Sequence, residues 1–463
     1  MTKRNEGDPK GMDSPSRRDF MAQMVSTAAL GALATLPGQA SAAPALTSSS
    51  AIATPDDESY WRWVADQFVI RDDITYMNTG TRGPSPRSVV EAQCNAIQAY
   101  DTDRLSYVRH VQNEAFRERL HVKMAALLGC DPDEVALTNN TTEGMAFGTL
   151  GPDMQPGDEI IYTNHDHSSG AQPINLRAAR YGVKPVVADL SDSKFHPPDS
   201  PDQLINAIEA AITPRTRLIS FCHINYTDGC VLPTKQICAM ARDKGILTLV
   251  DGAHAPGMME LDLHDLGCDM YAAAGHKFLL ASMLTGVFYV RRDVQDRIWP
   301  TIYSGPVDGM SMYGMEQPPS SYLDRSKTAR KFEIHGSGSY AAQASLDAAL
   351  DFHNAISTPA IEARDRYLAA RVREGLREIS GAQVHASNDP AMGCALVAFK
   401  LNNVATVELN DLLWDRHRIY IRNVTHEEIG WDANRASLHI MVNANQVDEF
   451  IGAVAEVARE RRS

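Results

Sequence analysis

Residues 247–254 read LTLVDGAH, a short hydrophobic run that ends in an acid, Asp251, followed directly by a glycine. Short apolar runs bounded by turn residues are typical of strands buried on both faces of a parallel sheet. Ligands of such sheets bind beyond the carboxyl ends of the strands. We therefore expect Asp251 to lie at the end of a buried strand, beside a ligand.

The same pattern recurs along much of the chain. Amphipathic stretches with helical spacing, such as residues 203–212 and 235–244, separate the strand-like runs. This alternation predicts an α/β fold in which a large, mostly parallel sheet carries helices on both faces. The expected strands are residues 134–138, 159–163, 184–188, 217–221, 247–251 and 287–290.

The alternation stops at residues 303–340, which are rich in Gly, Ser, Pro, Met and Tyr and predict a long loop. A long helix is expected at about residues 340–355, and the rest of the chain has mixed α/β composition. We therefore predict a signal peptide at residues 1–42, an N-terminal segment at 43–75, a large ligand-binding domain at 76–335 and a small C-terminal α/β domain at 336–463.

Lys277 is the most informative single residue. It lies in GHKF, residues 275–278, between two apolar runs. Such surroundings lower the pKa of a lysine and make its amine a good nucleophile. A lysine that forms a Schiff base, paired with an aspartate for the pyridinium nitrogen, is typical of pyridoxal-phosphate enzymes. Alone, Asp251 could cap a helix and Lys277 could extend to the surface. Together they predict pyridoxal 5'-phosphate as the cofactor.

A phosphate site is expected where residues 137–144, LTNNTTEG, end a strand and begin a helix. The N–H groups of a first helical turn bind anions, and Thr141 and Thr142 add hydroxyl donors. Ordinary helix capping is the alternative interpretation. His167 follows another strand, and its flat ring could stack on a cofactor ring. The alternatives are an ordinary loop histidine or a metal site shared with His165, but a single nearby acid is a weak metal pattern, and we predict no metal.

Motifs spread over residues 77–438 resemble the class V aminotransferases, the family that contains isopenicillin N epimerases and cysteine desulfurases. They are most similar to the epimerase-like branch. The resemblance implies the fold-type I architecture of pyridoxal-phosphate enzymes, as in aspartate aminotransferase. The motifs occur in the order of the family: MNTGTRGPSP at 77–86, NTTEG at 140–144, DGAHAPG at 251–257, GHK at 275–277, KFE at 331–333, GS at 336–337 and NRASL at 434–438.

The resemblance implies a role for each matching residue. Lys277 is the Schiff-base lysine and Asp251 the partner of the pyridinium nitrogen, and both are catalytic. His254 lies where the family places a residue near the phenolic oxygen of the cofactor. The resemblance also favours stacking for His167, which we count among the catalytic and cofactor-binding residues.

Other matches concern the phosphate and the substrate. The resemblance implies that Thr141, Thr142 and His276 hold the phosphate, and that Ser337 reaches it from the other subunit of a homodimer. Arg435 matches the arginine that binds the substrate carboxylate, a planar, bidentate role that suits this side chain. Taken alone, Arg435 would be interpreted as a surface arginine on a strand. The expected substrate is a small amino-acid-like molecule.

Two positions depart from the family pattern. Ala274 stands where many relatives have a hydroxyl that binds the phosphate. Residues 422–429, RNVTHEEI, are expected to form the loop in which desulfurases carry a nucleophilic cysteine, and this loop has none. A thiol must accept the sulfur as a persulfide, so the sequence argues against desulfurase activity.

The N-terminus is typical of a twin-arginine export signal. Arg17 and Arg18 precede an uncharged, Ala-rich run, and ASA at residues 40–42 fits a cleavage site. A disordered tail that contains two arginines is the alternative. We expect the export machinery to recognise the signal, cleavage after Ala42 and a periplasmic location.

The composition narrows the range of partners. Of the 463 residues, 44% are hydrophobic and 22% are charged, as in an ordinary globular protein. The net charge of −14, with no Lys/Arg run, argues against nucleic acid and anionic membranes as partners. We find no apolar stretch after the N-terminal region that would anchor the chain stably in a membrane. The seven cysteines form neither a disulfide framework nor a zinc pattern, and most are expected to be buried thiols.

The reaction is expected at the amino-bearing carbon of the substrate. Transamination needs one base, which Lys277 can provide, so we favour amino-group transfer in the periplasm. Epimerisation is the alternative, and it needs a second acid or base, for which His335 and the tyrosines of residues 303–340 are candidates. Another lyase reaction, or binding of the cofactor or an amine without turnover, is less favoured.

Overall fold

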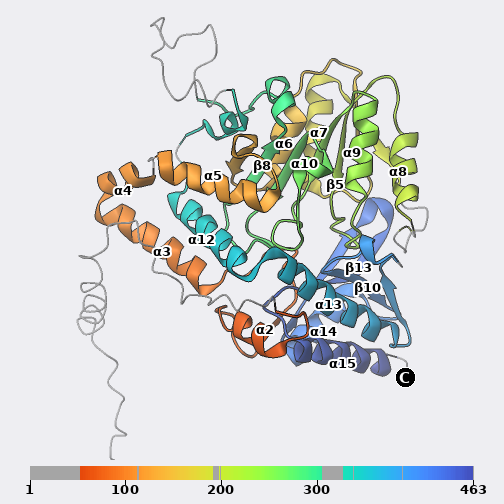
Figure 1. Ribbon diagram of the computed structural model, residues 1–463. Coiled ribbons are helices and arrows are strands. Elements are labelled where there is room, and N and C mark those ends of the chain that lie inside the picture. Colours follow the sequence, from red (N-terminus) through yellow and green to blue (C-terminus); the bar gives the residue numbers. More distant parts are fainter. Residues whose placement is uncertain are drawn as a thin grey trace, which may run out of the picture. The chain divides into compact units, whose positions relative to one another are not determined.

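The computed structural model of the protein describes residues 53–111, 114–190, 198, 200–304, 327–336, 338–387 and 389–461 (Figure 1). Several predictions fall outside these residues. They concern the signal peptide with its cleavage site, Ser337, and two of the candidate tyrosines, Tyr313 and Tyr322.

A seven-stranded sheet forms the centre of the larger part of the molecule, with the strand order β2-β8-β7-β6-β5-β3-β4 (Figure 1). Strands β7, β6, β5, β3 and β4 run parallel to one another, whereas β8 is antiparallel to both of its neighbours. The strands are β2 (Val135–Thr138), β3 (Glu159–Thr163), β4 (Lys184–Ala188), β5 (Thr216–Cys222), β6 (Leu247–Asp251), β7 (Met270–Ala274) and β8 (Gly286–Val290).

All six strands expected from the sequence are present, and the mostly parallel sheet is confirmed. Strand β7, whose residues read MYAAA, is not among the strands expected from the sequence. Three alanines and no β-branched residue give a weak strand signal, because strand propensity comes mainly from branched and aromatic side chains. Burial between β6 and β8 makes these residues a strand nevertheless.

Both faces of this sheet are buried, because successive side chains of a strand point to opposite sides. On one face Ile161 shares a hydrophobic core with helices α8 and α9. On the other face its neighbour Ile160 shares a core with helices α6 and α7. These helices are α6 (Thr141–Leu150), α7 (Ser168–Tyr181), α8 (Pro201–Ala210) and α9 (Thr234–Asp243).

A second, antiparallel sheet with the order β12-β13-β10-β9 lies in the C-terminal part (Figure 1). Helices α13, α14 and α15 pack with it in one core, to which Trp61 of helix α2 also belongs, so the N-terminal segment packs against the C-terminal part. The elements are α2 (Glu58–Ala65), β1 (Thr75–Tyr76), α13 (Thr358–Arg377), β9 (Ala382–His385), β10 (Leu396–Leu401), α14 (Thr406–His417), β11 (Ile419–Tyr420), β12 (Arg422–His426), β13 (Trp431–Ser437) and α15 (Ala444–Glu460), with β1 paired to β11.

The predicted long helix is confirmed as α12 (Tyr340–Ile356), which packs along α3. Among the described helices, none combines the length and the apolar character needed to cross a lipid bilayer. All seven cysteines are free thiols, and five are buried, as expected. The remaining elements are α3 (Arg87–Thr102), α4 (Arg104–Val111), α5 (Glu114–Leu128), α10 (Leu263–Leu266) and the 3-10 helices η1 (Pro132–Glu134), η2 (Arg292–Arg297), η4 (Ala329–Glu333), η5 (Pro390–Met392) and η6 (Glu427–Ile429).

Candidate active site

The candidate site lies at the carboxyl ends of the parallel strands. Asp251 is the last residue of β6, and Lys277 follows β7 after two further residues. Cys222, at the end of β5, is the register partner of Asp251 on the neighbouring strand. The position of Asp251 at the end of a buried strand is therefore as expected from the sequence.

Asp251 carries a buried oxygen atom that lacks a partner. The residue is 4% exposed, and its Oδ1 accepts a hydrogen bond from the N–H of Ala253 at 3.0 Å. Its Oδ2 has no hydrogen-bond partner among the described residues. Burial raises the pKa of Asp251, and the nearby charge of Lys277 opposes this shift. A protonated pyridine nitrogen would supply the missing hydrogen bond, so the site fits pyridoxal phosphate.

The amine of Lys277 lies beside His254. Lys277 Nζ is 3.2 Å from His254 Nε2, and the same Nε2 is 2.9 Å from the carbonyl oxygen of Gly80. Because a carbonyl oxygen can only accept, His254 Nε2 carries a hydrogen. Burial lowers the pKa of Lys277 to about 8. The charge of Asp251 opposes this shift, and the charge of Arg435 adds to it. The amine is therefore available as a base and nucleophile near neutral pH.

The segment before α3 holds the lysine backbone in place. The N–H of Gly83 donates to the carbonyl oxygen of His276 at 2.9 Å. A Cβ atom at Gly83 would lie 2.1 Å from the carbonyl oxygen of Lys277, closer than any real contact. Only glycine therefore fits here, which explains part of the motif at residues 77–86.

The start of helix α6 leaves donors free for an anion. Asn140, not a threonine, caps the helix: its Oδ1 accepts from the N–H of Glu143 at 3.0 Å. Thr142 is exposed, whereas Thr141 is buried and its hydroxyl has no partner among the described residues. His276 Nδ1 is also buried without a partner. Free donors of this kind are what a phosphate needs, so Thr141 and His276 fit the predicted site, and the role of Thr142 stays a prediction.

His167 is the N-cap of helix α7 and presents an exposed ring. Its Nδ1 accepts from the N–H of Ser169 at 3.1 Å, so its other nitrogen carries the hydrogen. The ring of Tyr226 packs edge-on against it at 5.0 Å between centroids. Stacking on a cofactor stays a prediction, which the exposed ring face supports. His165 is buried and bonds to Thr227 at 2.7 Å instead, so the two histidines have different partners.

Arg435 is buried, at 2% exposure, on strand β13. One guanidinium nitrogen donates to the carbonyl oxygen of Tyr226, while Nε is buried without a partner, and no carboxylate pairs with the side chain among the described residues. Burial lowers the pKa of Arg435 to about 10, and the charge of Arg422 adds to this effect. A buried charge without a counter-ion is costly, so a substrate carboxylate would offset that cost. The surface interpretation of Arg435 is therefore wrong.

Sequence reasoning missed several neighbours of the site. Tyr226 packs edge-on against His167, and the Ser169 hydroxyl lies 2.8 Å from His167 Nδ1, but neither residue belongs to a motif quoted above. Gly80 does lie in the motif at residues 77–86, but the motif does not predict that its carbonyl contacts His254. The expected loop at residues 422–429 is instead strand β12 followed by η6, because residues 422–426 pair with β13. Ala274 ends β7, and Ser337 lies outside the described residues.

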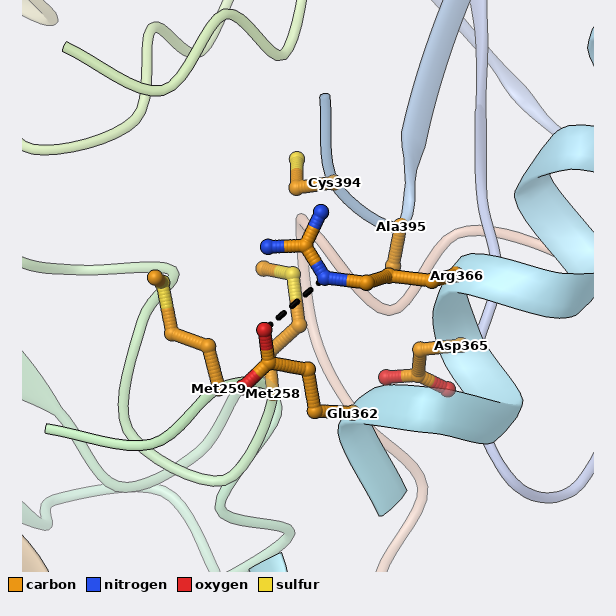
Figure 2. Close-up of a pocket in the computed structure, with 7 residues that line it drawn as sticks. All are labelled: Met258, Met259, Glu362, Asp365, Arg366, Cys394 and Ala395. Atoms are coloured by element: carbon orange, nitrogen blue, oxygen red, sulfur yellow. Dashed lines mark hydrogen bonds and ion pairs between the residues drawn. The ribbon is translucent and has the colours of Figure 1, made fainter. Parts of the chain in front are cut away.

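A separate small pocket lies away from these residues (Figure 2). Figure 2 shows the side chain of Arg366 extending into this space, where its Nε donates to Glu362 at 2.8 Å. The pocket is lined by Met258, Met259, Glu362, Asp365, Arg366, Cys394 and Ala395. An ion pair already occupies it, and none of the predicted site residues lines it.

Comparisons with known proteins agree with this geometry. Residues 76–450 match the family model described as aminotransferase class-V. The isopenicillin N epimerase of Amycolatopsis lactamdurans is 29% identical over 86% of this chain and 99% of its own length. A probable cysteine desulfurase of Xylella fastidiosa (strain 9a5c) is 27% identical over 83% of this chain and 91% of its own length.

A solved structure has the same fold. It is a variant of the enzyme C-DES with glycine covalently linked to its pyridoxal-phosphate cofactor, and it superposes with a TM-score of 0.72 at 24% identity, covering 84% of this chain and 98% of its own. This likeness confirms the fold-type I architecture expected from the sequence, and the family match supports the expected cofactor. The chain belongs to the class V aminotransferase family of pyridoxal-phosphate-dependent enzymes.

Proposed function

We propose that this enzyme transfers the amino group of a small amino-acid-like substrate to a 2-oxo acid, with Lys277 as its acid–base residue. The state of the Lys277 amine carries the proposal. Burial lowers its pKa to about 8, and it lies 3.2 Å from His254. A single base of this strength is sufficient for transamination.

The residues of the chain would divide the work as follows. Pyridoxal phosphate, when bound, withdraws electrons so that a proton can leave the α-carbon of the substrate. Arg435 binds the substrate carboxylate and thereby orients the α-carbon. The unpartnered oxygen of Asp251 would hold the protonated ring nitrogen of the cofactor. Lys277 would take the proton from the α-carbon of the substrate and hold it on its amine, while the carbonyl of Gly80 fixes the ring of His254 beside that amine.

Epimerisation is the second candidate, because the epimerase of Amycolatopsis lactamdurans matches nearly the whole chain. It needs a second group that delivers a proton to the opposite face of the α-carbon. Burial lowers the pKa of His254 well below its usual range, and the charge of Lys277 adds to this effect, so this histidine is a poor proton donor near neutral pH. His335 and the tyrosines of residues 303–340 stay candidates. Amino-group transfer needs none of them.

A desulfurase function receives no support from the thiols. Strand β12 and helix η6 carry no cysteine. Cys222 lies near the site, but it is 2% exposed and burial raises its pKa well above the usual value. Burial also raises the pKa of Cys394 to about 11. A thiol in this state is a poor nucleophile, because the thiolate is the reactive form.

The test is to incubate the enzyme in deuterium oxide with candidate amino acids, with and without an added 2-oxo acid. Keto product that depends on the acceptor supports transfer. Deuterium at the α-carbon with loss of optical purity, and no keto product, would establish epimerisation instead. A cofactor band that does not respond to any amino acid would favour binding without turnover.

We further propose that the enzyme is exported through the signal at residues 1–42 and acts in the periplasm as a homodimer. The twin arginines, the Ala-rich run and the ASA sequence support export. The family resemblance of Ser337, which would reach the phosphate of the other subunit, supports the dimer. The molar mass of the holoenzyme from sedimentation tests the proposed dimer, and a monomer with full cofactor content would contradict it.

A further inference from the structure

Arg422 lies directly opposite Arg435 in the small sheet. The two residues are register partners on the antiparallel strands β12 and β13. Residues that face each other in this way have their side chains on the same face of the sheet, a few ångströms apart. Like charges in such a pair destabilise the sheet unless an anion lies between or beside them.

Neither arginine has an acidic partner among the described residues. Arg435 bonds to a backbone carbonyl, and Arg422 donates to the hydroxyl of Thr81 at 3.1 Å. Arg435 is buried, whereas Arg422 is exposed. One cation thus lies deep in the site and a second lies at its rim.

The contact with Thr81 fixes the rim arginine at the same site. Thr81 donates its hydroxyl hydrogen to Asn78 at 2.8 Å, so its oxygen is free to accept from Arg422. The preceding residue, Gly80, accepts from His254, which adjoins Lys277. Thr81 therefore holds the guanidinium of Arg422, and its chain neighbour Gly80 contacts His254, which adjoins Lys277.

We propose that Arg422 binds a second carboxylate of the substrate, so that the enzyme prefers amino acids with an acidic group beyond the α-carboxylate. This inference rests on the proposed action at an amino-acid α-carbon. Arg435 binds the α-carboxylate in the buried position, and Arg422 binds the distal one at the rim. The substrate thus supplies the negative charge that the arginine pair lacks.

The experiment measures binding of dicarboxylates that have no amino group. The holoenzyme is titrated with succinate, glutarate and adipate, and with monocarboxylates of equal chain length, by calorimetry at fixed ionic strength. At least one dicarboxylate should bind about tenfold more tightly than its matched monocarboxylate, the factor that a charge-assisted hydrogen bond of about 1.4 kcal/mol contributes. Arg422→Gln should abolish this preference and leave the affinity for the monocarboxylate unchanged.

Two further variants make the result specific. Arg435→Gln should weaken binding of both ligand types. Arg217→Gln removes an arginine charge near the start of β5, at the end of the strand remote from the site, and should change the binding of neither ligand type. Equal binding of the two ligand types by the wild-type enzyme would overturn the proposal. An equal loss of affinity for both ligand types in Arg422→Gln would also overturn the proposal, because the two arginines would then bind the same carboxylate. Because these ligands cannot react, the result is independent of whether amino-group transfer occurs.

Discussion

The amine of Lys277 lies 3.2 Å from Nε2 of His254, and that nitrogen is hydrogen-bonded to the carbonyl oxygen of Gly80. The carbonyl fixes the hydrogen on Nε2, and burial keeps the imidazole neutral by lowering its pKa well below the usual range. His254 therefore adds no positive charge beside the lysine. Its Nε2 hydrogen is directed at Gly80, so the contact with Lys277 places a neutral ring beside the amine.

The first prediction concerns the pH at which this amine becomes reactive. With the cofactor removed, labelling of Lys277 by an amine-reactive reagent should rise with a midpoint near pH 8, because burial lowers its pKa to about 8. Asp251→Asn removes the charge that opposes this shift, so its midpoint should fall. Arg435→Gln removes a repelling charge, so its midpoint should rise. Peptide mass spectrometry measures the labelling, with exposed Lys244 as the internal reference. If the midpoint of Lys277 labelling is unchanged in both variants, the charges of Asp251 and Arg435 do not influence the pKa of Lys277.

The second prediction concerns cofactor attachment. Purified enzyme should have a visible absorbance band that borohydride abolishes, and Lys277→Arg should be colourless, since a guanidinium cannot form the covalent link. Lys244→Arg changes an exposed lysine and should keep the band. A Lys277→Arg protein that is still yellow and still reducible by borohydride would disprove the assignment.

The third prediction links a buried acid to stability. Glu333 accepts hydrogen bonds from His121 at 2.7 Å and from the N–H of Leu137, just ahead of the phosphate site, at 2.6 Å. Although burial alone would raise its pKa, His121, Leu137 and the charge of Arg117 lower it to about 2. The carboxylate therefore stabilises the fold above its ordinary pKa of 4.5, and this contribution is lost as the pH falls through about 2.

Glu333→Gln should therefore reduce the free energy of unfolding by about 3 kcal/mol at pH 7. The difference from wild type should shrink as the pH falls from 4.5 through about 2, because Glu333 of the wild type then takes up a proton and loses its charge. Urea unfolding at several pH values measures it. The exposed acid Glu428 provides the control, since Glu428→Gln should have little effect at any pH. A constant difference for Glu333→Gln across the pH range would contradict the argument.

The sequence predicted the sheet and the residues at its edge because both depend on local patterns. Asp251 ends an apolar run, and Lys277 is an isolated charge among apolar residues, so each is recognisable from its neighbours in the chain. The burial of Arg435 and its register with Arg422 depend instead on the pairing of β12 with β13. Local periodicity does not fix which residues face each other across strands. The motifs at residues 77–86 and 251–257 contain Gly80 and His254, but they do not reveal that the backbone carbonyl of the one is bonded to the ring of the other.

The fourth prediction concerns export. Replacing Arg17 and Arg18 with lysine should retain the protein in the cytoplasm, because the twin-arginine pathway depends on the arginine pair. Cells are separated into cytoplasmic and periplasmic fractions, and the amount of folded, cofactor-loaded enzyme in each fraction gives its location. Replacement of Lys3 and Arg4, which lie upstream of the pair, should leave export unchanged. Equal periplasmic recovery of the twin-lysine variant and the wild type would show that the arginine pair is not an export signal.

The last prediction uses two buried threonines of helix α6. The hydroxyls of Thr141 and Thr149 both lack a partner among the described residues. Thr141 begins the helix at the predicted phosphate site, and Thr149 lies near its other end. Removing a buried, unpaired hydroxyl while keeping its shape should stabilise the cofactor-free protein by about 1 kcal/mol in Thr141→Val and in Thr149→Val alike.

The two variants should differ once the cofactor binds. Thr141→Val removes a donor to the phosphate, so the dissociation constant for pyridoxal phosphate should rise about tenfold. Thr149→Val should bind the cofactor as tightly as the wild type. Thermal unfolding of the cofactor-free proteins gives the first comparison, and fluorescence titration with pyridoxal phosphate gives the second. If Thr141→Val gains stability but keeps full cofactor affinity, its hydroxyl does not contact the phosphate. If both variants lose affinity equally, the effect belongs to the helix as a whole.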